Sequence, residues 1–168
     1  VIGAAVFYIL RSRPNNTINH SEYPIIGIDI SKHNNKIDFN TLKADSLNFV
    51  FIKATEGNNY KDPMFESNYS NAKKIGLKVG AYHFFRFGKD GTVQAYNFLK
   101  SVKGKHIDLP LVIDVEEWNN DIWVPKKKAI ARLDAMVKCL ESNNSKVMIY
   151  TNKDGFHKYI ENNFNHLP

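Results

Sequence analysis

The sequence predicts a single α/β domain with a parallel sheet, arranged as a TIM-barrel-like (β/α) fold. Three observations support this prediction. Short apolar segments alternate along the chain with segments of helical periodicity, which is the pattern of repeated β/α units. The intervals between the apolar segments are long enough for helical crossovers between parallel strands. A polar side chain stands at or just after the end of each apolar segment, and a barrel brings the carboxyl ends of all its strands to one mouth.

Five β/α units are expected. With 168 residues and 43% apolar content, the chain is long enough for one sizeable core and too short for two. Because a closed barrel has eight strands and about 250 residues, we expect the C-terminal strands of the barrel to be missing from this chain. The expected strands are residues 25–30, 49–54, 78–84, 111–115 and 146–150.

Helices are expected between these strands. The first has Asp38 as its N-cap, and the second begins at Pro63 and ends before Gly76, which is the usual asymmetry of helix ends. No glycine-rich phosphate loop follows Ile30, so a nucleotide-binding open sheet is disfavoured. The expected helices are residues 39–44, 63–75, 93–102, 125–141 and 156–160.

The N-terminal residues 1–14 are expected to be the end of a signal anchor or signal peptide, because an almost wholly apolar run stops at Arg11 and Arg13. An ordinary apolar strand or helix is the alternative. Residues 15–24 would then be a linker and residues 25–168 the N-terminal part of the barrel domain. This organisation predicts a protein of the cell envelope or a secreted protein, anchored in the membrane or exported.

The charge of the chain limits the kinds of partner that it can bind, and its cysteine content limits the kinds of covalent link and metal site that it can form. The net charge is +6 and the pI is near 9.3, but the lysines are scattered and no nucleic-acid-binding signature is present. We therefore expect no nucleic acid partner, and an acidic surface or cell-wall polymer fits the charge equally well. The single cysteine, Cys139, excludes an internal disulfide and a site of several thiolates for zinc.

Residues 109–118 form the segment with the clearest chemical signal. An apolar run ends abruptly in carboxylates, and in an extended chain Asp114 and Glu116 project to the same face with Cα atoms about 6.6 Å apart. Two carboxyl groups this close acquire different pKa values, as general acid–base chemistry requires. Glu117 should point the other way, into solvent. The alternative is a strand that runs into a solvated acidic loop.

Four ordered segments resemble motifs of the Chalaropsis-type lysozymes, glycoside hydrolase family 25. They are residues 27–31 (GIDIS), 51–57 (FIKATEG), 76–84 (GLKVGAYHF) and 109–116 (LPLVIDVE). The resemblance covers about residues 25–150. It implies a barrel of five β/α units followed by three further strands, and hydrolysis of the β-1,4 bond after N-acetylmuramic acid in the glycan strands of peptidoglycan. We expect no cofactor and no metal.

Glycoside cleavage needs one protonated and one ionised carboxyl group. Glu116, longer and beside Trp118 at the rim, is the predicted general acid, and Asp114 is expected to stay ionised as electrostatic stabiliser. Asp29 is the third predicted catalytic residue. The resemblance implies a substrate-assisted route, in which the acetamido oxygen of the sugar attacks while Asp114 orients it. The predicted substrate-binding residues are Glu56, Tyr82, His83, Trp118 and Tyr150.

Several of these residues have simpler interpretations. Glu56 is equally compatible with a solvated loop charge, His83 with a core histidine, and the tyrosines with ordinary packing. Two other function classes also remain. One is a glycan-binding domain without catalysis, and the other is a metal-dependent barrel enzyme, although no His-x-x-x-His spacing supports it. Its ligands would be Asp29, Glu56, His83, Asp114 and Glu116.

Overall fold

The computed structural model describes residues 23–34, 37–44 and 47–168. The predicted anchor, residues 1–14, and most of the predicted linker lie outside these residues. Within the described part of the chain, no helix combines the length and the apolar character needed to cross a membrane.

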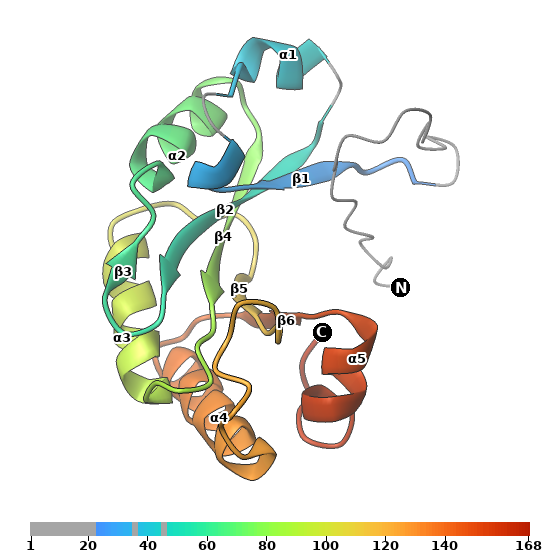
Figure 1. Ribbon diagram of the computed structural model, residues 1–168. Coiled ribbons are helices and arrows are strands. Elements are labelled where there is room, and N and C mark those ends of the chain that lie inside the picture. Colours follow the sequence, from blue (N-terminus) through green and yellow to red (C-terminus); the bar gives the residue numbers. More distant parts are fainter. Residues whose placement is uncertain (1–22, 35–36, 45–46) are drawn as a thin grey trace.

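The sheet is built from consecutive parallel strands, as predicted. Each long strand after the first pairs in parallel with the long strand that precedes it in the chain, which is the order of a barrel wall and not of an open doubly wound sheet. Figure 1 shows the resulting curved sheet. In spatial order the strands are β1 (Gly27–Ile30), β2 (Phe49–Glu56), β4 (Lys78–Phe84), β5 (Leu111–Asp114) and β6 (Val147–Tyr150).

A short hairpin was not predicted. Strand β3 (Tyr60–Lys61) pairs antiparallel with the end of β2, where a plain loop was expected. Gly57 makes the turn with a φ of 52°, a left-handed conformation that favours glycine. The side chain of Asn97 donates hydrogen bonds to the carbonyl oxygens of Gly57 and Tyr60 at 2.9 and 3.2 Å. These bonds fix the hairpin to a neighbouring helix.

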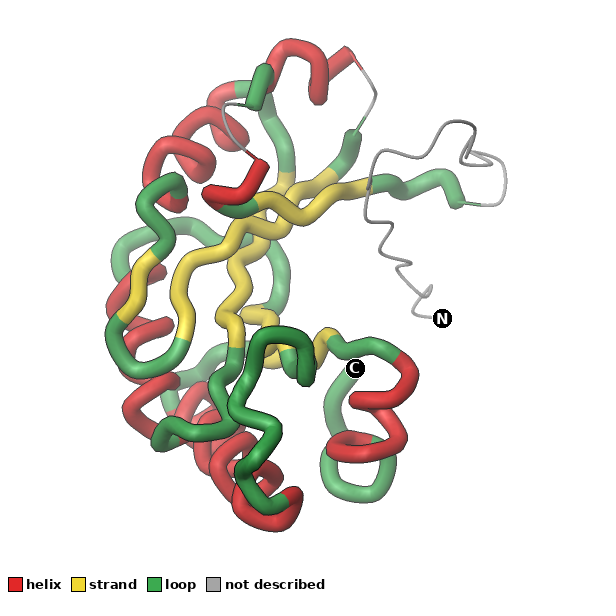
Figure 2. Tube along the Cα trace, in the orientation of Figure 1, coloured by secondary structure: helices red, strands yellow, loops and turns green. Residues whose placement is uncertain are grey.

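The main helices lie where the periodicity predicts them, to within about two residues. Helices α2 (Phe65–Lys74), α3 (Gly91–Val102) and α4 (Lys126–Ser142) cover the convex side of the sheet (Figures 1 and 2). Two short helices, η1 (Lys32–Asn34) and α5 (Lys153–Gly155), were not predicted, and the predicted last helix is the π-helix η2 (Phe156–Ile160). The predicted helices are α1 (Phe39–Ala44), α2 (Phe65–Lys74), α3 (Gly91–Val102) and α4 (Lys126–Ser142).

The two faces of the sheet have different surroundings. The larger core lies between the sheet and the helices, and its fully buried side chains include Ile52, Phe98, Leu133 and Met136. A smaller cluster on the concave face contains Phe49, Phe51 and Val112, with partly buried Tyr82, Leu109, Met148 and Tyr150 packed against it. This concave face corresponds to the inside of a barrel wall.

The far edge of β6 is only lightly covered. Among the described residues no further strand pairs with it, and the amide of Ile149 donates a hydrogen bond to the carbonyl oxygen of Pro168 at 3.3 Å. The expected additional barrel strands stay a prediction.

Glycines on the concave face make room for aromatic rings. A Cβ atom at Gly80 would lie 2.2 Å from the ring of Phe51, and one at Gly27 would lie 2.2 Å from the ring of Phe49. The Phe51 ring thus lies across the neighbouring strand because Gly80 has no side chain. This packing places Phe51 in the floor of the cavity described below.

Substitution Gly80→Ala is therefore expected to destabilise the protein. The added methyl group must displace the Phe51 ring or the strand, and overpacking of this kind costs about 1–3 kcal/mol. Urea unfolding of the parent and the variant measures the difference. The double variant Gly80→Ala with Phe51→Leu should recover part of the loss, and an unchanged unfolding midpoint for Gly80→Ala alone would show that Phe51 does not need this space.

Candidate active site

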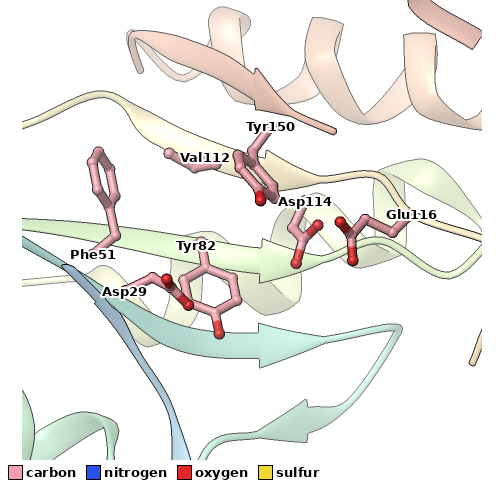
Figure 3. Close-up of a pocket in the computed structure, with 7 residues that line it drawn as sticks. All are labelled: Asp29, Phe51, Tyr82, Val112, Asp114, Glu116 and Tyr150. Atoms are coloured by element: carbon pink, nitrogen blue, oxygen red, sulfur yellow. The ribbon is translucent and has the colours of Figure 1, made fainter. Parts of the chain in front are cut away.

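A cavity of about 140 Å³ opens on the concave face toward the carboxyl ends of the strands. The strand register explains its composition, because it places Asp29 beside Phe51, Tyr82 beside Val112 and Asp114 beside Tyr150. Alternate residues of each strand point inward, and Glu116 joins them from the segment that follows β5. Figure 3 shows the lining residues, which are Asp29, Phe51, Tyr82, Val112, Asp114, Glu116 and Tyr150.

The structure thus brings the three predicted catalytic carboxyl groups to one cavity. The carboxyl groups of Asp114 and Glu116 point toward one another past the end of β5 (Figure 3). The Oδ1 atom of Asp114 is buried and has no hydrogen-bond partner among the described residues. A buried, unpaired carboxyl oxygen is energetically costly. It is therefore available to bind a polar group of a ligand that fills the cavity.

The pKa values of all three carboxyl groups are raised. Burial raises the pKa of Glu116, and the negative charge of Asp29 raises it further. Burial also raises the pKa of Asp29, against a smaller effect of a backbone hydrogen bond. A glutamic acid with a raised pKa keeps its proton at a pH where an exposed glutamate has lost it. Such a group can act as a general acid.

Asp114 differs from its prediction. It was expected to stay ionised, but burial, followed by the charge of Glu116, raises its pKa well above the usual value, against the opposing effect of Lys53. The end of β5 is enclosed by neighbouring strands, and this burial cannot be deduced from the local sequence. In the unliganded protein Asp114 therefore holds a proton more readily than an exposed aspartate.

Two of the predicted substrate-binding residues line the cavity, namely Tyr82 and Tyr150. Burial and then the nearby charge of Asp29 raise the pKa of Tyr82 above its usual range. Burial and then the charge of Glu116 raise the pKa of Tyr150 to about 12. Both phenols therefore stay protonated at neutral pH. Their rings and hydroxyl groups give the cavity amphipathic walls.

Glu56 does not line the cavity. Its carboxylate accepts hydrogen bonds from Lys53 Nζ at 2.8 Å and Arg86 Nε at 2.8 Å. Burial alone would raise the pKa of Glu56, but the hydrogen bonds from Lys53 and Arg86 and their charges hold it below its usual value. Glu56 therefore joins the ends of β2 and β4 beside the cavity. The Arg86 guanidinium also donates to the carbonyl oxygen of Asn119 in the loop after β5.

His83 lies in the core, as its simpler interpretation proposed. It is fully buried, its Nδ1 atom lies 2.7 Å from Thr55 Oγ1, and its Nε2 atom lies 3.1 Å from Gln94 Oε1. Burial lowers its pKa to about 4, so the ring is neutral at physiological pH. Since β4 alternates its side chains, a residue next to Tyr82 faces the helices and not the cavity. The structure does not place His83 in contact with a ligand there.

Trp118 and Glu117 lie outside the cavity in the segment that follows β5. Trp118 is exposed, with 74% of its surface accessible. Glu117 is not the free solvated charge that was expected, because its Oε1 atom accepts a hydrogen bond from the hydroxyl group of Tyr159 at 2.6 Å and pairs with Lys158. Glu117 therefore links the segment beside Glu116 to helix η2.

Asn120 was missed by the sequence analysis, although it holds the same segment in place. Its side-chain nitrogen donates to the carbonyl oxygens of Phe85 at 2.7 Å and Glu116 at 2.8 Å. Its side-chain oxygen accepts from the amides of Phe87 at 3.0 Å and Asp121 at 2.8 Å. The amide group thereby ties the backbone of Glu116 to the segment after β4. An asparagine in a loop has no periodic signal that would reveal this role.

Metal ligands do not converge in the described part of the chain. Among residues 23–34, 37–44 and 47–168, no three His, Cys, Asp or Glu side chains are grouped so that they could hold a metal ion. Two of the five ligands considered for a metal enzyme do not reach the cavity, since His83 lies in the core and Glu56 is paired with Lys53 and Arg86. No metal site is proposed.

Comparison with known proteins gives a consistent result. The family model described as "Glycosyl hydrolases family 25" matches residues 28–168. Over 154 residues the chain is 34% identical to the uncharacterized protein YegX of Escherichia coli (strain K12), which covers 88% of this chain and 56% of YegX. Over 94 residues it is 44% identical to lysozyme M1 of Streptomyces globisporus, which covers 54% of this chain and 32% of that protein.

The fold is also similar to a solved structure of a family 25 glycosyl hydrolase from Bacillus anthracis. The TM-score is 0.84 and the sequence identity is 33%, over 93% of this chain and 73% of that chain. This likeness supports the barrel-type arrangement of the parallel sheet. The chain spans little more than half the length of YegX, the 56% given above.

Proposed function

Because the chain belongs to family 25 of the glycosyl hydrolases, we propose that the protein is a peptidoglycan hydrolase of the lysozyme type. It would cleave the β-1,4 bond between N-acetylmuramic acid and N-acetylglucosamine in the glycan strands. The whole protein's activity, substrate and location at or outside the cell envelope are all parts of this proposal. The identity to lysozyme M1, 44% over 94 residues, supports the choice of substrate.

One observation carries the proposal, namely the convergence of Asp29, Asp114 and Glu116 on one cavity. These carboxyl groups come from two strands and one loop. Burial is the largest cause of the raised pKa of each of them. Burying three acids together destabilises a fold, and such groupings are typical of functional sites. A pair of carboxyl groups that flank the bond to be cleaved is the arrangement that glycoside hydrolysis uses.

Glu116 acts as the general acid in this proposal. It protonates the glycosidic oxygen as the bond to the anomeric carbon breaks, and the released sugar leaves with a new hydroxyl group. The same carboxylate then takes a proton from the water that completes hydrolysis. The hydrogen bond from Asn120 to the Glu116 carbonyl oxygen, at 2.8 Å, fixes the backbone from which this side chain extends.

Asp114 acts as orienting group and electrostatic stabiliser. In the substrate-assisted route the acetamido oxygen of the sugar attacks the anomeric carbon, and positive charge develops on the acetamido group. The unpartnered Oδ1 atom of Asp114 can accept a hydrogen bond from the acetamido N–H. That positive charge also lowers the pKa of Asp114, so this carboxyl group releases its proton to solvent water and acts as a carboxylate when the charge develops.

Activity is expected to fall as the pH rises through the pKa of Glu116, because the general acid must be protonated. Burial and the charge of Asp29 raise this pKa. In a plot of kcat/KM against pH, the midpoint of the alkaline limb should therefore lie above the usual pKa of a glutamate, about 4.3. Asp29→Asn removes the negative charge that helps to raise the pKa of Glu116, and it should therefore move the alkaline limb to lower pH. A limb that stays in place or moves upward would contradict the assignment of Glu116.

The proposal is tested by incubating the full-length protein with purified peptidoglycan and measuring new reducing ends. A hydrolase releases them in proportion to time and enzyme. A glycan-binding domain without catalysis, the alternative, would sediment with the cell wall and release none. Binding without reducing ends would therefore overturn the proposed hydrolysis and favour the alternative.

A further inference from the structure

The loop between β5 and α4 exposes large apolar side chains beside the candidate general acid. We define the tryptophan loop as residues 116–124. Trp118 is 74% exposed, Ile122 66% and Trp123 76%. Most large apolar side chains of the described chain are at least partly buried, and three such exposed side chains on one short loop mark an interaction surface.

The tryptophan loop is held in a defined conformation. Besides the four hydrogen bonds of Asn120 described above, the side chain of Asp121 accepts a hydrogen bond from the amide of Gly88 at 3.1 Å. The Arg86 guanidinium, from the same segment after β4 as Gly88, donates to the carbonyl oxygen of Asn119. The amide of Val124 donates to the carbonyl oxygen of Asp121 at 3.0 Å. The indole rings are thus presented by an ordered loop, which reduces the entropy lost on binding.

The position of the loop suggests what it binds. The cavity encloses about 140 Å³, which is less than a typical small-ligand pocket of about 300 Å³ or more. A polysaccharide bound there must therefore continue outside it. A general acid contacts the glycosidic oxygen, so the two sugars of the cleaved bond meet at Glu116. In Figure 3, Asp29, Asp114 and the two tyrosines lie on one side of Glu116. The tryptophan loop begins at Glu116, and its other residues do not line the cavity.

We propose that the tryptophan loop is a binding surface for the glycan chain on the leaving-group side of the cleaved bond, with the rings of Trp118 and Trp123 as its stacking positions. This inference rests on the proposed function. The C–H face of a pyranose ring packs on an indole ring, and the indole N–H can donate to a sugar hydroxyl group. The first sugar on this side is N-acetylglucosamine. Further sugars of the strand extend over the loop.

The test measures binding of peptidoglycan glycan strands freed of their peptides, with four and with eight sugars, by calorimetry. The full-length protein carries Glu116→Gln so that strands are not cleaved. The parent should bind eight sugars more tightly than four. Trp118→Ala and Trp123→Ala should each lose roughly tenfold in affinity for the longer strands, the order expected for one aromatic contact with its buried area.

The matched control is Tyr96→Ala, which removes an aromatic side chain that is 59% exposed on helix α3. It should bind as the parent does. Trp123→Phe should recover most of the lost affinity, because it keeps an aromatic face, and this separates stacking from damage to the loop. The proposal fails if the tryptophan variants bind long strands normally, or lose short and long strands equally.

A further outcome would also overturn the proposal. If the tryptophan variants dissociate a dimer of the parent and leave glycan affinity unchanged, a second copy of the chain covers this surface. Failure of the proposed hydrolysis is a separate result, since it appears as an absence of reducing ends with the protein that retains Glu116. Length-dependent binding can be measured whether or not the bond is cleaved.

Discussion

Glu116→Gln is expected to abolish turnover of peptidoglycan while leaving binding of the glycan strands nearly intact. An amide has almost the shape of a carboxyl group but cannot donate the proton that the leaving oxygen needs. Loss of a general acid reduces the rate by about 10²- to 10⁴-fold. Release of reducing ends measures turnover, and sedimentation with purified cell wall measures binding.

The control for Glu116→Gln is Glu66→Gln. The Glu66 side chain is 72% exposed on α2, where it pairs with Lys105, and its loss should change the rate little. Glu117 is unsuitable as a control because it bonds to Tyr159 and Lys158 beside the site. Substantial activity in Glu116→Gln would show that another group donates the proton.

Asp114→Asn is expected to cut the rate by about 10²- to 10³-fold, since a neutral amide cannot stabilise the positive charge on the acetamido group. The same change should stabilise the folded protein near pH 7. Folding raises the pKa of Asp114. The favourable contribution of its protonated form to the free energy of unfolding is therefore fully present below the unfolded pKa of about 3.9. This contribution is lost as the pH rises through the folded pKa.

Removing this buried acid should therefore raise the unfolding temperature at pH 7 by about 2–4 °C, the shift that about 1 kcal/mol produces in a domain of this size. At about pH 3 the difference should disappear, because Asp114 is then protonated in both states. Calorimetry at the two pH values measures the effect. An Asp114→Asn variant that is less stable at pH 7 would mean that the carboxylate is paired in the fold and not isolated.

The fold could be predicted because its determinants are local. The apolar segment at residues 78–84 coincides with β4, and the helix expected at residues 39–44 coincides with α1. The hairpin strand β3 escaped prediction because two residues are too few to show alternation. The π-helix η2 was expected only as a helical stretch, since periodicity over five residues does not separate one kind of helix from another.

The candidate site could be predicted where strand alternation applies. Asp29, Tyr82, Asp114 and Tyr150 occupy inward positions of their strands and line the cavity. The same rule excludes His83, which is next to Tyr82 and faces the core. The register shift between Lys53 and Thr55 interrupts the alternation before Glu56, so the position of Glu56 could not be deduced from spacing.

Other features of the site depend on contacts between distant segments. The partners of Glu56 include Arg86, 30 residues away, and those of Asn120 include Phe85, 35 residues away. The raised pKa of Asp114 depends on burial that only the assembled strands create. These properties arise from tertiary structure, so residue types and spacing alone could not reveal them.

The identity of the newly formed reducing sugar is the most direct test of the proposed function. Purified peptidoglycan is digested with the full-length protein, the fragments are reduced with borohydride, and the terminal sugar is identified by mass spectrometry. The account predicts reduced N-acetylmuramic acid with the parent and none above background with Glu116→Gln. Reduced N-acetylglucosamine as the terminal sugar would contradict the bond assignment, and so the account of this cavity as a muramidase site.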